Sequence, residues 1–205
     1  MNLLDNLTWL GHSSFRIAGK KIIYIDPFQV KAGIPADLIL VTHDHYDHFD
    51  RNSITNIKKN DTIIVAPASV CRQISGDTRP VRPGAQMNFD SVTIKAVPAY
   101  NIGKKFHPRE NQFVGYIIHA DNIIYYHAGD TDLIPEMQDI RADVALLPIG
   151  GTYTMDAIEA AQATKIIHPQ VAVPMHWGTV SGSHADAEKF AQLANCQVVI
   201  LNKGK

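Results

Sequence analysis

The residues best suited to chemistry lie in one stretch of six, His43-Asp44-His45-Tyr46-Asp47-His48. The stretch directly follows residues 37–42 (DLILVT), an apolar run that is typical of a buried strand. We therefore expect it to form the loop at the end of that strand, where α/β folds place their ligands. A His-x-His pair in that loop can direct two imidazoles at one metal ion, and the Asp-His pair that follows can serve a second ion.

The donor atoms of this loop limit the metals that it can hold. Imidazole nitrogens combined with carboxylate oxygens suit zinc, and also manganese or iron. A polar loop that is rich in histidine by chance is disfavoured, because crowding so many titratable groups costs stability unless something neutralises them. The sequence therefore predicts a metal centre, with Zn²⁺ as the first choice and Mn²⁺ or Fe²⁺ as alternatives.

Three further candidate ligands lie next to predicted strands. Asp130 follows a strand in His127-Ala-Gly-Asp-Thr131, where Gly129 frees the backbone to bend. His176 follows a strand in Pro174-Met-His-Trp-Gly178, and His107 lies in the loop before the strand at residue 113. Loops at one edge of a sandwich converge in space, so we expect all three groups to meet the first loop.

The elements that must position these groups alternate between hairpins and βα units. Apolar runs predict strands at residues 7–12, 14–17, 21–25, 37–42, 62–66, 92–97, 113–119, 123–127, 142–149, 171–175 and 197–201. Helical patterns predict helices at residues 50–59, 68–74, 133–140, 155–167 and 183–194. Two halves that each begin with hairpins fit two sheets packed face to face with helices outside. We expect an α/β fold, a four-layer αββα sandwich, formed by one domain over residues 1–205.

Composition excludes several classes of protein. The chain has 205 residues, 45% hydrophobic and 19% charged, as in ordinary globular proteins. A net charge of -1 argues against a nucleic-acid-binding surface. No apolar stretch approaches the ~18–20 residues of a transmembrane segment, and the N-terminus lacks the pattern of a signal peptide. Two isolated cysteines, Cys71 and Cys196, form no disulfide framework, so we expect a cytoplasmic protein.

These motifs, taken in order, resemble the metallo-β-lactamase fold superfamily. The resemblance rests on His43-x-His45-x-Asp47-His48, Gly129-Asp130-Thr131 and Pro174-Met175-His176. Gly11-His12-Ser13, Ile25-Asp26-Pro27 and Tyr126-His127-Ala128-Gly129-Asp130-Thr131 make the chain more similar to one branch of small metal-dependent hydrolases. That branch includes the ascorbate-6-phosphate lactonases and N-acyl-phosphatidylethanolamine phospholipase D. The resemblance covers essentially the whole chain.

The resemblance implies two divalent metal ions. One would be held by His43, His45 and a third histidine, the other by Asp47, His48 and His176, with Asp130 bridging the pair. The third histidine is where this chain departs from the pattern, because Pro98-Ala99-Tyr100 is followed by Asn101. Either His107 supplies the missing ligand from a few residues downstream, or the first site is weakened; we favour His107.

The expected activity is hydrolysis of an ester, lactone or phosphodiester of a small molecule by a hydroxide that bridges two metals. Asp47 and Asp130 are the expected catalytic residues, Asp47 by orienting the attacking hydroxide as well as ligating. One alternative is a metal-binding or sensor protein without turnover, which Asn101 keeps open. A nuclease is a second alternative, although the chain has no basic surface and no room for an RNA-binding insertion.

A further set of residues flanks the predicted ligands. These residues are expected to support the ligands or to contact substrate: His12, Asp26, Tyr100, Asn101, His127, Tyr153 and Trp177. The loop of residues 100–112 carries Lys104, Lys105 and Arg109, which favours a small substrate with an anionic group. The sequence gives no indication of the oligomeric state.

Overall fold

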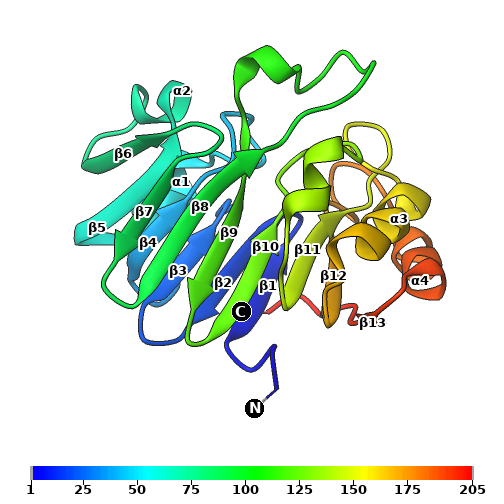
Figure 1. Ribbon diagram of the computed structural model, residues 1–205. Coiled ribbons are helices and arrows are strands. Elements are labelled where there is room, and N and C mark those ends of the chain that lie inside the picture. The colour runs from blue at the N-terminus through cyan, green and yellow to red at the C-terminus, as the bar shows by residue number, and fades with distance from the viewer. Residues whose placement is uncertain (1, 205) are drawn as a thin grey trace.

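The computed structural model describes residues 2–204, and its strands form two sheets that lie face to face (Figure 1). The first sheet has the order β1-β2-β3-β4-β5-β6, in which the first three strands are antiparallel and the later ones parallel. Its strands are β1 (Leu7–Gly11), β2 (Ser14–Ala18), β3 (Ile22–Ile25), β4 (Ala36–Leu40), β5 (Lys58–Pro67) and β6 (Asp77–Val81).

The second sheet repeats this plan, with the order β13-β12-β11-β10-β9-β8-β7. Strands β7 to β10 are antiparallel, and β10 to β13 are parallel. Its strands are β7 (Gln86–Phe89), β8 (Val92–Pro98), β9 (Val114–Ala120), β10 (Ile123–His127), β11 (Val144–Pro148), β12 (Val171–Met175) and β13 (Gln197–Val198). The expected succession of hairpins and then βα units in each half is confirmed.

Helices cover the outer faces of both sheets (Figure 1). Helices α1 (Arg51–Ile57) and α2 (Ala68–Cys71) lie on the first sheet, and α3 (Ala157–Ile167) and α4 (His184–Leu193) on the second. Two short 3-10 helices, η1 (Arg109–Asn111) and η2 (Pro135–Asp139), lie in connecting segments. The layers therefore follow the expected αββα order.

Alternation along the central strands explains why the first sheet is covered on both faces. On β3 and β4, Ile25 and Leu40 join the large core between the sheets, whereas Tyr24 and Ile39 join a second core beneath α1 and α2. Successive side chains of a strand point to opposite faces, so continuous apolar runs are what a doubly covered sheet requires.

Several expected boundaries differ from the structure. Helix α1 is shorter than residues 50–59, because β5 begins at Lys58. Helix α2 ends at Cys71 rather than at residue 74, and the expected α-helix at residues 133–140 is replaced by the shorter 3-10 helix η2. Strand β13 covers only two of the residues 197–201, and β6 and β7 were not predicted at all.

The ends of the strands gather the candidate ligands at one edge of the sandwich. The turn between β1 and β2, the segments after β3, β4, β10 and β12, and the loop between β8 and β9 all reach this edge. That last loop, residues 99–113, is green in Figure 1 and projects beyond the sheets. None of the helices within residues 2–204 is long and apolar enough to cross a membrane.

Candidate metal centre

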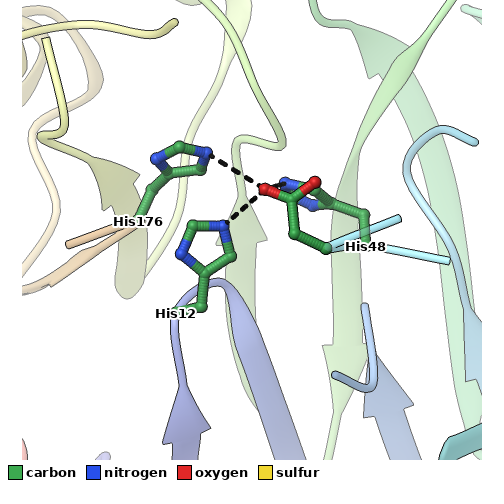
Figure 2. Close-up of side chains that lie close together, drawn as sticks. His12, His48 and His176 are labelled. Carbon is green, nitrogen blue, oxygen red and sulfur yellow. Dashed lines mark hydrogen bonds and ion pairs between the residues drawn. The ribbon is translucent and has the colours of Figure 1, made fainter. Parts of the chain in front are cut away.

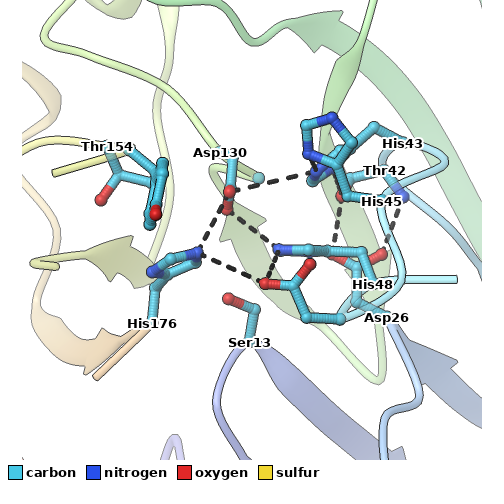
Figure 3. Close-up of polar contacts among 12 residues, drawn as sticks. Ser13, Asp26, Thr42, His43, His45, His48, Asp130, Thr154 and His176 are labelled. Atoms are coloured by element: carbon cyan, nitrogen blue, oxygen red, sulfur yellow. Dashed lines mark hydrogen bonds and ion pairs between the residues drawn. The ribbon is translucent and has the colours of Figure 1, made fainter. Parts of the chain in front are cut away.

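Asp26 anchors the loop that follows β4 (Figure 3). Its carboxylate accepts hydrogen bonds from the Thr42 backbone N–H at 2.7 Å and from Thr42 Oγ1 at 2.7 Å. It also accepts one from His48 Nδ1 at 2.7 Å, while His43 Nδ1 lies 3.0 Å from Thr42 Oγ1. Because the Thr42 hydroxyl donates to Asp26, it accepts from His43. Both imidazoles are therefore held with the proton on Nδ1, which leaves each Nε2 lone pair unused.

One group of candidate ligands consists of His43, His45 and His107, whose ring nitrogens all lie within 4.8 Å of one another. His45 Nδ1 is 3.1 Å from His43 Nε2 and 3.0 Å from His107 Nε2. His107 Nδ1 faces the Tyr153 carbonyl at 3.2 Å, so its proton is held there and its Nε2 is an acceptor. A single proton on His45 Nδ1 can satisfy only one of the two facing lone pairs at a time, whereas a cation satisfies all three nitrogens.

A second group consists of His12, Asp47, His48 and His176, whose ligand atoms also lie within 4.8 Å of one another. Figure 2 shows His12, His48 and His176 directed toward one carboxylate, which belongs to Asp47. His176 Nδ1 lies 3.2 Å from Ser181 Oγ, so this nitrogen is engaged outside the group and Nε2 is directed into it.

Asp130 lies between the two groups (Figure 3). Its Oδ1 is 3.2 Å from His48 Nε2, and its Oδ2 is 3.1 Å from His176 Nε2 and 3.4 Å from His107 Nε2. Gly129 makes this position reachable, because its φ of 65° favours glycine and a Cβ there would approach the Val114 carbonyl oxygen to 2.8 Å. Asp130 thus has the place that a bridging carboxylate would need.

Buried atoms without partners indicate that the donor set fits metal ions. His48 Nε2 and Asp130 Oδ1 are buried and have no hydrogen-bond partner among the described residues, although they lie 3.2 Å apart. Leaving such polar atoms unpaired costs free energy, so each requires an explanation. Nitrogen and carboxylate ligands of this kind suit zinc, manganese or iron. The residues present can therefore bind metal, and Asp130 lies between the two groups.

His12 differs from the other imidazoles in its outer nitrogen. Its Nε2 lies 3.0 Å from Asp47 Oδ2, but its Nδ1 is buried without a partner among the described residues. A histidine that binds metal through Nε2 needs an acceptor for its Nδ1 proton, as His43, His48, His107 and His176 each have. His12 has none, so its proton belongs on Nε2, where it donates to Asp47. This geometry favours a role in orienting Asp47 over direct ligation.

Burial and mutual contact determine the charges in the site. Burial lowers the pKa of His107 to about 4 and that of His43 well below its usual value. For Asp130, burial alone would raise the pKa, but the neighbouring His176 and His48 hold it well below the usual range. Burial also opposes ionisation of Asp47, but His12 and His48 lower its pKa to about 2. Burial alone would lower the pKa of His48, but Asp130 and Asp26 raise it well above its usual value. His43 and His107 are therefore in the neutral form that metal binding needs, whereas a metal ion held by His48 would have to displace its proton.

The loop that carries His107 is fastened by two contacts. Asn101 Nδ2 donates to the Tyr153 carbonyl at 2.6 Å, and the same carbonyl faces His107 Nδ1. Lys104 Nζ lies 2.5 Å from Asp132 Oδ1 and 2.7 Å from the Thr154 carbonyl oxygen. The first contact orients the imidazole, and the second holds the loop against the segments after β10 and β11.

The other residues singled out in the sequence lie around the metal-binding groups in different ways. His127 is fully buried, with Nε2 2.8 Å from the Ser13 carbonyl oxygen and Nδ1 accepting from the Gly129 N–H, so it supports the turn that presents Asp130. Tyr153 lines the pocket over the site. Tyr100 instead bonds Glu136, and Trp177 stacks on Trp9 with ring centroids 4.9 Å apart. Neither of the last two lines that pocket.

Sequence reasoning overlooked several residues that shape the site. Thr42 contacts the ring of His43, and Ser181 contacts the ring of His176. In the sequence, the only indication of these roles was a hydroxyl side chain close to a predicted ligand. The Lys104–Asp132 pair gave no signal, because the two residues are far apart in the chain and a basic loop resembles a solvated surface. Phe106 and Val180, which line the pocket, were also not singled out.

Residues 6–176 match the protein family described as beta-lactamase superfamily domain. The chain belongs to this family. UPF0173 metal-dependent hydrolases of Thermoplasma acidophilum and Thermoplasma volcanium are 36% and 39% identical to it, over 93% and 92% of this chain and 92% and 90% of their own.

Solved structures agree with that assignment. A crystal structure of a metal-dependent hydrolase from Parabacteroides distasonis has a TM-score of 0.86 and 30% identity, covering 97% of this chain and 93% of that chain. The metallo hydrolase Igni18 from Ignicoccus hospitalis has a TM-score of 0.80 and 30% identity, over 97% of this chain and 95% of its own. The expected superfamily and the metallo-β-lactamase-like fold are confirmed.

Proposed function

We propose that this chain is a metal-dependent hydrolase that uses two divalent ions to cleave an ester, lactone or phosphodiester bond of a small molecule. The observation that carries the proposal is the convergence of two groups of histidine and aspartate side chains on the Asp130 carboxylate. The name metal-dependent hydrolase, which relatives covering nearly the whole chain bear, supports the same activity.

The pocket above Asp130 supports water as the nucleophile. Within residues 2–204, no serine, threonine or cysteine lines this pocket, so the chain offers no aliphatic hydroxyl or thiol there to attack the substrate. Two bound divalent ions would lower the pKa of a shared water to near neutrality and polarise a carbonyl or phosphoryl oxygen.

The chain's own residues set the geometry of that reaction. The Asp130 side chain is nearly fully buried and contacts both groups of candidate ligands, so it fixes the distance between them. Asp47 lines the pocket and accepts a hydrogen bond from His12, so its carboxylate is directed where it can orient the attacking water. Both cysteines are free thiols. This fits a reducing compartment, so the proposal includes a cytoplasmic location. It also includes zinc as the first choice of metal, because the candidate ligands are imidazole nitrogens and carboxylate oxygens.

The test compares turnover and metal content in one preparation. The metal-loaded protein is assayed with a chromogenic phosphodiester and with a simple lactone, and Asp130→Asn serves as the control because it keeps the shape of the side chain. We expect about two ions per chain and turnover of at least one substrate that Asp130→Asn loses. Equal rates for both proteins on every substrate would refute the proposed activity, and one ion per chain would refute the two-ion centre.

A further inference from the structure

A cavity of about 430 Å³ opens over the metal centre, and half of its lining comes from residues that are not candidate ligands. Those residues are Asp44, Tyr46, Phe106, Tyr153 and Val180. A substrate whose reacting bond lies at Asp130 must place its remaining atoms against them. Their chemistry therefore indicates what the rest of the substrate is.

Aromatic and aliphatic surface dominates this wall. Tyr46 is 69% exposed and Phe106 is 43% exposed, although both are large side chains that normally gain from burial. Phe106 packs edge-on against Tyr153 with centroids 5.0 Å apart, and Tyr46 packs in the same manner against Phe28 at 6.1 Å. Exposed rings that gather at the mouth of a cavity are typical of a ligand-binding surface.

Positive charge is missing from the wall. Within residues 2–204, no lysine or arginine lines the cavity. The two basic residues that could have turned toward it are engaged elsewhere: Lys104 pairs with Asp132, and Arg109 pairs with Glu136 at 2.7 Å. Lys105 is exposed and does not line the cavity. The basic character of this loop therefore does not reach the substrate.

Asp44 adds a negative charge beyond the candidate ligands. It is half-buried in the wall of the cavity and forms no ion pair with any described residue. An anionic group on the outer part of a substrate would meet this carboxylate with no lysine or arginine of the cavity lining to offset it. An uncharged alkyl or aryl group would instead bury against Phe106, Tyr46 and Val180.

We infer that the substrate is a neutral ester or lactone whose acyl or alkyl portion is apolar, and that Phe106 and Tyr46 bind that portion while Asp44 disfavours anionic ones. The inference rests on the proposed function for the position of the reacting bond. It replaces the expectation of an anionic substrate, which rested on three basic residues that the cavity does not contain.

Binding tests the inference without turnover. Heptanohydroxamic acid and the monohydroxamate of heptanedioic acid present the same metal-binding group and chain and differ in a terminal methyl versus a terminal carboxylate. Calorimetric titration into the zinc-loaded protein should give at least about tenfold tighter binding of the methyl-terminated probe. Burial of the terminal methyl contributes about fourfold, and placing a carboxylate in the same apolar surroundings near Asp44 is unfavourable.

Matched variants connect this preference to the wall. Phe106→Ala should weaken the methyl-terminated probe about tenfold, whereas Leu193→Ala, which removes a side chain of the same 43% exposure on α4, should have no effect. Asp44→Asn should tighten the carboxylate-terminated probe selectively. Equal affinity for the two probes, tighter binding of the carboxylate, or equal effects of Phe106→Ala and Leu193→Ala would overturn the inference.

Turnover is measured separately on p-nitrophenyl hexanoate and mono-p-nitrophenyl adipate. Preference for the neutral probe without hydrolysis of either ester, of the lactone or of the phosphodiester would refute the proposed function and leave the binding preference for an apolar group standing. Hydrolysis of both esters with a preference for the adipate would refute the inference and leave the proposed function standing.

Discussion

Replacing Lys104 by methionine tests whether the loop that carries His107 depends on its contact with Asp132. The lysine head group has three acceptors: Asp132 Oδ1 at 2.5 Å, the Thr154 carbonyl at 2.7 Å and the Gly151 carbonyl at 3.3 Å. Methionine has a similar length and flexibility but no donor. The Asp132 side chain is only 7% exposed, so the substitution leaves a buried carboxylate whose remaining contact is the Ile102 N–H at 2.8 Å.

The magnitude follows from burial on the two sides of the pair. Breaking a fully buried ion pair costs about 3–5 kcal/mol, because one charge remains without a partner. The lysine side chain is 28% exposed, which reduces its share. We therefore expect Lys104→Met to lower the free energy of unfolding by about 2–3 kcal/mol. Since the loop also positions His107, the affinity for the ion bound by His43, His45 and His107 should fall about tenfold.

The assay combines urea unfolding of the metal-free protein with zinc titration against a competing chelator. Lys105→Met is the matched control, because Lys105 is the exposed neighbour of Lys104. Asp132→Asn removes the unpaired charge, so it should cost less when Lys104 is already methionine than in the native chain. If Lys104→Met and Lys105→Met gave the same unfolding free energy and zinc affinity, the reasoning would be refuted. A change in unfolding alone would refute the link to His107.

Two further predictions concern single histidines. His12→Gln should retain the affinity for both ions, because glutamine can donate to Asp47 although it is a poor metal ligand. His12→Ala should lower the affinity for one ion about tenfold, as measured by titration against a competing chelator. If both variants lost affinity equally, His12 would instead be a ligand. For His107, the unfolded chain takes up a proton below pH 6.5 while the folded residue resists protonation down to about 4, so the metal-free protein should lose stability as the pH falls through this range. Between pH 6.5 and 5, the free energy of unfolding of His107→Gln should therefore fall by about 1.5 kcal/mol less than that of the native chain. An equal fall for the two proteins, measured by urea unfolding at each pH, would contradict the prediction.

The fold could be predicted where side-chain pattern and burial agree. Continuous apolar runs marked the central parallel strands, since these are covered on both faces. Strands β6 and β7 were missed because they lie at the edges of their sheets, where exposed polar residues and a proline are tolerated. Strand β6 contains such a proline, Pro80.

The site could be predicted as far as residue type carries the chemistry. Histidines and aspartates at strand ends have few other uses in such numbers, and the structure brings His43, His45, Asp47, His48, His107, Asp130 and His176 together. Side-chain direction could not be predicted in the same way. Tyr100 and Trp177 flank the ligand segments but point to Glu136 and Trp9, because orientation within a loop depends on packing that no local pattern encodes.

The position of His107 explains why the chain departs from the expected spacing. At residue 101 the backbone has just left β8, and its side chain is an amide that holds the Tyr153 carbonyl. The imidazole of His107 comes six residues later in the same loop. The two ends of this segment are joined by a hydrogen bond, in which the Asn101 N–H donates to the His107 carbonyl at 2.8 Å. A ligand directly at the end of a strand would be positioned by the sheet. A ligand on this loop depends on Asn101 and on the Lys104–Asp132 pair, so the first metal group should be the one whose affinity responds to substitutions outside the ligands.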